Sequence, residues 1–500
     1  MMSRSLTLFI LLATGWGCPA LLIAQDSGEP DTIRITAPLI ETRWQEAPGG
    51  VTLIDQEDIR AGRAPLQPTD ALSLAPGVLV QNRDNFAQNP RVSIRGFGAR
   101  APFGVRGVRV RLDGIPLTTV DGQAQIDAID PGSIDSVEVL RGANAVLHGN
   151  GSGGLLDYRS IHPHRAAHAR LDAQAGGFGL RRVHGAFAAR HEALAYRLAA
   201  TQLQQDGYRD QSEVERRNAS LQLNHRQGNR EWFGILNHLH NPLAEDPGGL
   251  TYEEWQDDPE QAASLAAAMN AGQRVDQNIV SPGLVQRFAD PDHQLRVQSW
   301  LIERDFQQQL PFPGDSLIRY DRRILGAALH YQRPLGELTL HTQFSLETQR
   351  DDRQRFCRNT DLDPYLCRSG ISTDLALDQI ERARNTGLGL QLAGPALNEQ
   401  GRWIIGLRHD RLKLAIDDQL QPDGIDNSGE RLYRETHYSL GYSHALNPNW
   451  NAFGQFATSY ETPTFTEFAN PDGSGFRPGL EPQYSESIEV GLRTRQYRYR

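Results

Sequence analysis

Between Asp70 and Tyr158 the sequence carries four short apolar motifs joined by glycines, which read DALSLAPGV (70–78), IRGFG (94–98), VRLDGIPL (110–117) and IDSVEVLRG (134–142). A glycine-rich run, GNGSGG (149–154), follows them. Each glycine relieves a backbone constraint at a turn or at a close approach of two segments. The motifs therefore predict short strands joined by tight turns. Taken alone, they also suit a small soluble α+β domain.

In their order and spacing, the four motifs resemble the plug domain of TonB-dependent outer-membrane receptors. The resemblance implies a mainly β protein, with an N-terminal α+β plug domain inside a transmembrane antiparallel β-barrel. On this basis we divide the chain into a signal peptide (1–24), a TonB box and linker (25–44), a plug domain (45–162) and a barrel (163–500). One motif departs from the family pattern at Ala143, where proline is usual.

The first residues are typical of a secretory signal peptide. Arg4 precedes an apolar run from Leu6 to Leu12, and the small residue Ala24 stands at the expected cleavage site. Cys18 raises the alternative of a lipoprotein acylation site. However, Trp16 and Gly17 stand where small or branched apolar residues would be expected.

No later run approaches the roughly 20 apolar residues of a spanning helix, and the mean hydropathy of −0.52 is that of a water-soluble protein. A β-barrel reconciles this composition with a membrane, because only alternate residues of each strand face lipid. Residues 338–347 alternate in this way, with Leu, Leu, Thr, Phe and Leu on one face and Thr, His, Gln, Ser and Glu on the other. A soluble β-sandwich also alternates, but short turns that exchange places with long connections favour a barrel.

Counting the alternating runs predicts roughly fourteen strands. Barrels of outer-membrane transporters with a plugged lumen have about 22. The chain is therefore expected to cover about two thirds of such a barrel. Either it is a fragment, which we favour, or the barrel is unusual, because an unclosed barrel would leave two unpaired edges in lipid.

Two cysteines, Cys357 and Cys367, remain after removal of the signal peptide, and they lie in a polar segment. An even pair at short separation in an exported chain predicts a local disulfide. The alternative is a metal site with Asp361 and Asp363. It lacks histidine and a second CxxC motif, so we expect no metal and no cofactor.

A short β-branched segment between the signal peptide and the plug resembles a TonB box. An extended segment on a flexible tether can add itself as a strand to the edge of a partner's sheet, and the resemblance implies that this partner is TonB. The alternative is an N-terminal strand that docks on the plug itself. The predicted box residues are Asp31, Thr32, Ile33, Arg34, Ile35, Thr36 and Ala37.

Arg95 and Arg141 occupy the two arginine motifs of the family. By resemblance, they face glutamates of the barrel wall and hold the plug in the barrel. Glu489 matches one such glutamate, and Glu435 is a weaker candidate for another. Alternatively, each arginine is a solvated charge in the lumen.

Two plug segments are expected to face outward and to contact the ligand. They contain Arg83 and Phe86, and Arg100, Phe103 and Arg106. Arginine beside an aromatic ring suits an anionic, planar ligand, through paired hydrogen bonds and stacking. Alternatively, these loops are solvated and bind nothing.

The segment DPGGLTYEEWQDDP (246–259) is similar to a loop of the subgroup linked to uptake of pyrroloquinoline quinone, a tricarboxylated redox cofactor. The resemblance covers this loop alone. The net charge of −10 does not argue against an anionic ligand, because the local charge of the lumen controls binding.

The sequence contains no recognisable catalytic arrangement and no phosphate-binding GxxxxGK[ST] motif. The acidic balance disfavours nucleic-acid binding. We therefore expect a non-enzymatic monomer in outer-membrane lipid that imports a scarce large solute, such as a ferric siderophore, with energy from TonB. A pyrroloquinoline quinone receptor is the alternative ligand assignment. A passive porin and a non-transporting surface receptor are alternatives of another class.

Overall fold

The computed structural model describes residues 34–35, 42–61, 65–81, 84–101, 104–142, 147–163, 167–290, 292–359, 367, 374–396, 400–421, 424–469 and 475–494. The predicted signal peptide (1–24), Arg83 and Phe103 lie outside the described residues. So do all residues of the predicted box except Arg34 and Ile35. The elements below belong to one compact unit that begins at Arg34.

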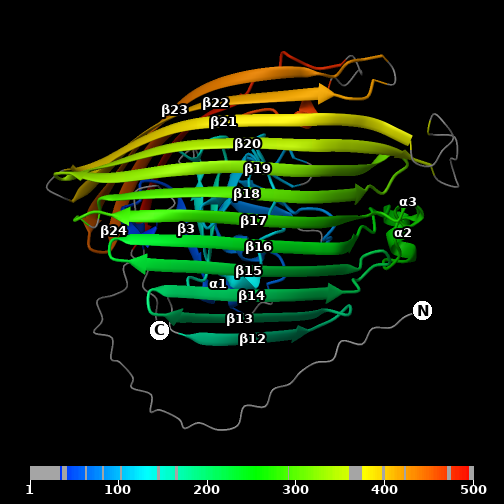
Figure 1. The fold of residues 1–500 in the computed structure, drawn as a ribbon, viewed down its shortest axis with the longest axis horizontal. Coiled ribbons are helices and arrows are strands. Elements are labelled where there is room, and N and C mark those ends of the chain that lie inside the picture. The colour runs from blue at the N-terminus through cyan, green and yellow to red at the C-terminus, as the bar shows by residue number, and fades with distance from the viewer. Residues whose placement is uncertain are drawn as a thin grey trace, which may run out of the picture. The chain divides into compact units, whose positions relative to one another are not determined.

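Fourteen strands form one antiparallel sheet in which each strand pairs with the next along the chain (Figure 1). The predicted mainly β fold and the predicted strand number are both confirmed. The strands are β12 (His168–Ala175), β13 (Arg181–His191), β14 (Leu194–Gln205), β15 (Val214–Gln227), β16 (Arg230–Glu245), β17 (Gly272–Arg287), β18 (Gln294–Gln309), β19 (Gly314–Leu335), β20 (Leu338–Arg358), β21 (Asp374–Ala396), β22 (Gly401–Asp418), β23 (Gly429–Asn447), β24 (Trp450–Glu461) and β25 (Gln483–Thr494).

A soluble sandwich has an apolar inner face and a polar outer face. The large sheet shows the opposite arrangement on β20. On β20, Phe344 is 46% exposed on the outward face, whereas His341, Gln343 and Glu347 are at most 7% exposed on the other. The period of two along a strand separates these two sets of side chains. In this part of β20 the apolar side chains therefore face outward and the polar side chains face inward.

The plug domain contains two smaller sheets, with the strand orders β3-β10-β11-β7-β8 and β4-β5-β6-β9. Short helices join them. The bounds are η1 (Trp44–Glu46), β3 (Val51–Asp55), α1 (Gln56–Arg60), η2 (Asp70–Leu74), β4 (Val78–Gln81), β5 (Arg91–Ile94), β6 (Val105–Arg106), β7 (Val108–Leu112), β8 (Ile115–Pro116), β9 (Gln123–Ala124), η3 (Pro131–Ser133), β10 (Ile134–Arg141) and β11 (Gly154–Ser160).

The last glycine of the GNGSGG run permits the central pairing of the five-stranded sheet. Gly154 begins β11 directly opposite Arg141 of β10, with a φ of 141°. A Cβ atom at this position would collide with the carbonyl oxygen of Leu140. Only glycine fits, because both the backbone angle and the close approach exclude a side chain.

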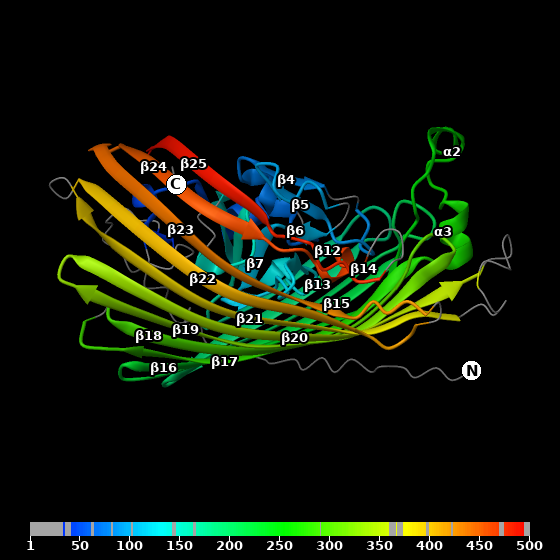
Figure 2. The ribbon, with the colours of Figure 1, turned by 90° about the horizontal axis from the view of Figure 1, so that it is seen from above.

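The large sheet curves around the plug domain (Figure 2). The polar face of the sheet meets the plug, since Gln349 accepts a hydrogen bond from the N–H of Val120 and Arg304 donates to Asp127. One hydrophobic cluster contains the plug residues Val110 and Leu156 together with Val275 and Trp300 of the sheet. The two domains therefore share part of their core. Polar contacts make up much of the remaining interface, as described below.

The connections of the large sheet differ between its two ends. At one end they are short, for example residues 228–229, 336–337 and 448–449. At the other end several are long, for example residues 246–271 and 462–482. The long connections contain α2 (Tyr252–Asp257), α3 (Ser264–Met269) and η5 (Phe465–Glu467). Among the described residues, no helix has the length and apolar character needed to cross a membrane.

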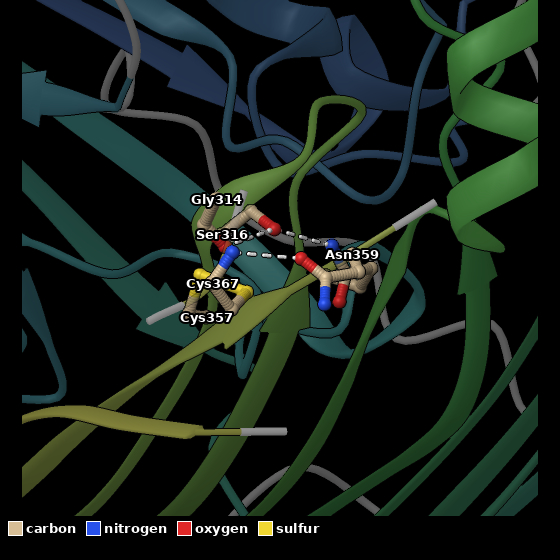
Figure 3. Close-up of a disulfide and its surroundings, with 6 residues drawn as sticks. Gly314, Ser316, Cys357, Asn359 and Cys367 are labelled. Atoms are coloured by element: carbon tan, nitrogen blue, oxygen red, sulfur yellow. Dashed lines mark hydrogen bonds between the residues drawn. A yellow bond between two sulfur atoms is a disulfide. The ribbon is translucent and has the colours of Figure 1, made fainter. Parts of the chain in front are cut away.

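Cys357, on β20, forms a disulfide with Cys367 (Figure 3). The N–H of Cys367 also donates a 2.8 Å hydrogen bond to Oδ1 of Asn359. Bridged sulfurs cannot serve as thiolate ligands, and no group of three or more His, Cys, Asp or Glu residues in the described part of the chain could hold a metal ion. Asp361 and Asp363, named above as possible ligands, lie outside the described residues.

We predict that a thiol reagent labels the folded protein without residues 1–24, and thus without Cys18, only after reduction. Because the bridge closes a short loop, replacing both cysteines with serine should lower the free energy of unfolding by about 2–3 kcal/mol. Mass spectrometry of the labelled protein and denaturant unfolding measure the two effects. The Cys357→Ser/Cys367→Ser variant is the control that should take up no label in either state. Labelling of the unreduced wild type would contradict the bridge.

Candidate functional site

One contact between the plug domain and the large sheet joins Arg95 to Glu489. Arg95 follows β5, and Glu489 lies on β25. Arg95 Nη2 donates a 2.6 Å hydrogen bond to Glu489 Oε1, and the backbone N–H of Gly50 donates to Oε2 at 3.1 Å. The two side chains keep 36% and 16% exposure, so we expect the pair to contribute no more than about 1 kcal/mol. Its main effect is to fix the position of the plug against β25.

Arg141, at the end of β10, lies beside the same carboxylate. Its Nη1 donates a 2.7 Å hydrogen bond to the carbonyl oxygen of Pro76. Burial and the positive charge of Arg95 lower the pKa of Arg141, against the opposing effect of Glu489. A Cβ atom on Gly50 would lie 2.8 Å from Arg95 Nη2, 2.9 Å from Glu489 Oε1 and 3.1 Å from Arg141 Nε. Three of the four residues expected to join plug and barrel therefore converge on one glycine.

Glu435, the fourth residue, lies elsewhere, and its expected pairing with a plug arginine is corrected. Its Oε1 accepts a 3.2 Å hydrogen bond from the hydroxyl of Tyr484, and its Oε2 lies 3.6 Å from Nε2 of His437. Within the described ranges, it forms no ion pair with an arginine. Glu435 belongs to β23, and side chains of the sheet itself occupy its oxygens.

Arg493 makes a second attachment, which the sequence reasoning missed. Its guanidinium donates hydrogen bonds to the carbonyl oxygens of Trp44 (2.8 Å), Ala47 (2.6 Å) and Gly49. It also lies over the rings of Trp44 and Phe453, at 5.0 and 4.8 Å from their centroids. The signal was present in the sequence. Residues four apart on a strand share a face, so Arg493 faces the plug as the glutamate of the lock does.

Two more side chains of the sheet bind the same segment. Ser443 Oγ donates to the carbonyl oxygen of Glu46 at 2.7 Å, and Asn451 Nδ2 donates to that of Gln45 at 3.0 Å. We call Ser443, Asn451 and Arg493 the linker clamp. Every hydrogen bond of the clamp goes to a backbone carbonyl, so the clamp holds residues 44–49 by their main chain.

The described part of the predicted box is a strand. β1 (Arg34–Ile35) pairs antiparallel with β2 (Thr42–Arg43), with Arg34 opposite Arg43 and Ile35 opposite Thr42. These two residues of the predicted box are thus paired through their backbone with residues 42–43, which directly precede the segment held by the linker clamp. The remaining box residues, Asp31, Thr32, Ile33, Thr36 and Ala37, lie outside the described residues.

Arg100 and Arg106, two of the expected ligand contacts, already have carboxylate partners. Arg106 contacts Glu461 at 3.0 Å and Glu467 at 2.5 Å, and Arg100 contacts the same two residues at 3.3 and 3.9 Å. Burial opposes ionisation of Glu467, but its hydrogen bonds and the two arginine charges lower its pKa. The sequence reasoning missed both glutamates, which arrive from the far end of the chain.

These charges border a cavity of about 220 Å³. Arg100 is 53% exposed, whereas Arg106 is only 14% exposed. An anionic ligand would therefore meet Arg100 first and would compete with two carboxylates for it. The cavity is lined by Arg95, Gly96, Phe97, Gly98, Arg100, Arg106, Glu461 and Gln483.

Phe86 is partly buried and belongs to a loop of the plug that is fastened to the sheet. Arg216 lies over its ring, at 5.2 Å from the centroid. Asn85 Nδ2 and Gln88 Nε2 each donate a 2.8 Å hydrogen bond to the buried carboxylate of Asp246. The structure thus gives Phe86 a packing role. Arg83 and Phe103 lie outside the described residues.

Buried ion pairs connect the plug to other strands. Asp127 accepts two hydrogen bonds from Arg304, of 3.0 and 2.7 Å. Asp130 lies 3.4 Å from Nδ1 of His184 and 3.5 Å from Nη2 of Arg182. Burial alone would raise the pKa of Asp130, but the hydrogen bond and charge of His184 and the charge of Arg182 lower it to about 2. The plug is therefore held as an ionised, polar insert.

Comparison with protein families identifies two domains. The TonB-dependent receptor plug domain matches residues 43–155, and the TonB-dependent receptor-like β-barrel matches residues 157–500.

The curated relatives match about 30% of this chain. A hemin receptor of Yersinia enterocolitica is 31% identical over 149 residues, which is 30% of this chain and 20% of that protein. A ferrichrome outer membrane transporter/phage receptor of Escherichia coli K12 is 31% identical over 152 residues, 30% of this chain and 18% of that protein. The chain thus aligns with about a fifth of the length of these relatives.

Solved structures share the fold over most of the chain. The unliganded ferric citrate transporter FecA superposes with a TM-score of 0.74 at 16% identity, over 90% of this chain and 68% of that one. The copper transporter OprC gives 0.70 at 17% identity, over 91% and 70%. The two family models together span nearly all of the described residues, in the order that the plug and the large sheet take in the structure. The chain therefore belongs to the family of TonB-dependent receptors.

Proposed function

We propose that this protein imports a scarce, large iron chelate across the outer membrane, with TonB supplying energy through the N-terminal box. The observation that carries the proposal is the linker clamp. Residues 44–49 follow the box after six intervening residues and are held against the sheet by their main chain. A pull on the box would load this segment first and the plug next.

Two observations weigh against functions of another class. A separate N-terminal domain lies inside the curve of the sheet (Figure 2) and packs against it, whereas a passive porin needs an open lumen. A surface receptor that does not transport has no need of a fastened linker ahead of its plug. The hemin and ferrichrome proteins named above support an iron chelate as the cargo.

A second candidate ligand is a planar aromatic polycarboxylate, such as pyrroloquinoline quinone. Tyr252 and Trp255, in the loop that resembles this subgroup, are 67% and 53% exposed. Their rings stack at 5.9 Å with an interplanar angle of 29°. Exposed stacked rings offer a surface for another flat π-system. Hemin shares this flat shape, so the same rings suit an iron-containing alternative.

The box assignment predicts that Ile35→Pro abolishes uptake and leaves binding of external ligand intact. Proline removes a backbone donor and blocks strand addition to the partner's sheet. Uptake of radioactive iron chelate by cells, compared with binding to the same cells without an energy source, measures both effects. Ile35→Val keeps the donor and should behave as the wild type. Normal uptake by the proline variant would refute the assignment.

The linker clamp predicts that Arg493→Gln loosens residues 44–49. Hydrogen bonds from a charged donor are worth about 1.5–3 kcal/mol, so local opening should become roughly ten- to a hundredfold more frequent. Hydrogen exchange of the amides of residues 44–50 measures the change. Glu486→Gln, on the outward face of the same strand, is the control. Equal exchange in wild type and Arg493→Gln would show that the clamp does not limit opening.

For the ligand, we predict that Arg100→Ala weakens binding of an anionic ferric chelate. A charge-assisted hydrogen bond of about 1.5–3 kcal/mol corresponds to roughly ten- to a hundredfold in affinity. Arg106→Ala should weaken binding further, because it leaves Glu461 and Glu467 without their main cation. Arg83→Ala belongs in the same series.

Titration of whole cells with an anionic ferric chelate, hemin and a neutral chelate measures these effects. Adding Glu461→Gln to Arg106→Ala separates repulsion by this carboxylate from the lost contact, because it removes the negative charge without restoring the guanidinium. For a neutral ligand, replacing Phe86 and Phe103 with alanine should weaken binding more than replacing the arginines. Unchanged affinity for every anionic chelate after loss of all three arginines would exclude an anionic ligand.

A further inference from the structure

The outward face of β21, β22 and β23 carries a group of cations that transport does not explain. We define the cation patch as Arg384, Arg411, Lys413 and Arg434. Arg384 lies directly opposite Lys413, and Arg411 lies directly opposite Arg434. All four side chains are exposed. Their neighbours Asn385 and Glu435 are buried on the plug side, so the period of two along each strand places the patch on the outside.

The patch has a surplus of positive charge. Residues directly opposite each other in a sheet have Cβ atoms about 4.5–5.5 Å apart, and like charges at such positions destabilise the pairing. Lys413 is compensated by Glu430, at 2.6 Å. Within the described residues, the three guanidinium groups have no ion pair.

The adjacent row of the same face shows the contrast. Arg323, Arg350 and Arg382 are also directly opposite one another on β19, β20 and β21. Each of these arginines has a carboxylate partner, at 3.4 Å (Glu303), 2.9 Å (Asp352) and 3.4 Å (Asp417). The protein thus supplies anions to one row of cations and leaves the three arginines of the cation patch to an anion from outside.

An apolar surface borders the patch on the side of the short turns. Leu390, Leu407 and Tyr438 form a cross-strand row on the same three strands. They are 39%, 44% and 50% exposed. Leu388 lies between this row and the patch and is 48% exposed. A molecule that covers both surfaces needs an anionic head and an apolar tail.

We propose that the cation patch binds the phosphorylated headgroup of a membrane lipid, whose acyl chains lie along the row of Leu390, Leu407 and Tyr438. A phosphate presents several charged oxygens to more than one guanidinium at once. The acyl chains would cover the exposed apolar row in the same molecule. The proposal rests on the proposed function only in that it places this face of the sheet in lipid.

The test uses the full chain purified in detergent, with phosphatidic acid as the probe and diacylglycerol of the same acyl chains as the reference. Native mass spectrometry measures the bound lipid. We expect Arg384→Gln/Arg411→Gln/Arg434→Gln to weaken phosphatidic acid binding about a hundredfold, because each basic residue at an anionic lipid surface is worth about fivefold. The charge-matched control replaces Arg190, Arg230 and Arg333, exposed arginines near the short turns, with glutamine.

Several outcomes would overturn the proposal. Equal binding of phosphatidic acid by the wild type and the patch variant would show that the cation patch does not bind the headgroup. An equal loss of lipid binding in the control variant would show that the loss follows from the lower net charge of the protein and not from the cation patch. Competition by inorganic phosphate at the same concentration as the lipid would make the ligand a free phosphate.

Unchanged thermal unfolding of the patch variant serves as the control that the loss of lipid binding is local. Failure of the uptake experiments with Ile35→Pro would leave this binding assay untouched, so the two proposals fail separately.

Discussion

The polar face of the large sheet must find partners, and the arrangement of the plug follows from this constraint. A buried charge is costly unless it is paired or hydrogen-bonded. Arg182 and Arg304 therefore meet plug carboxylates, and Arg408 donates a 2.8 Å hydrogen bond to the carbonyl oxygen of Leu147. An interface of this kind can exchange its partners for water at a modest cost.

The sequence predicts the fold well because both of its signals are local. Alternation is readable within ten residues, as in 338–347, and the glycine motifs lie within one domain of the chain. Pairings between domains are not local. Asp127 and Arg304 are 177 residues apart, and the sequence near either residue does not predict that the two will pair. Arg493 could be inferred to face inward from its spacing to Glu489, but its carbonyl partners could not.

The arginines near the cavity illustrate a second limit. Arginine close to an aromatic residue indicates that an anion can be bound, but it does not say whether the protein supplies that anion. Here Glu461 and Glu467 do so for Arg100 and Arg106. Around Gly50 the balance is reversed, because Arg95 and Arg141 lie close to a single carboxylate, Glu489, which pairs with Arg95. Residue types suggest chemistry, whereas the surplus or deficit of charge appears only when distant segments meet.

The linker clamp also has a mechanical consequence. Its hydrogen bonds reach the carbonyl oxygens of Trp44, Gln45, Glu46 and Ala47 in chain order. Tension applied from the N-terminal end would load these bonds one after another. The force needed to detach the segment would then be that of a single hydrogen bond. A segment gripped by all its bonds in shear would resist with their sum. Because every residue carries a backbone carbonyl, side chains of residues 44–49 can also be replaced without loss of the hydrogen bonds to the linker clamp.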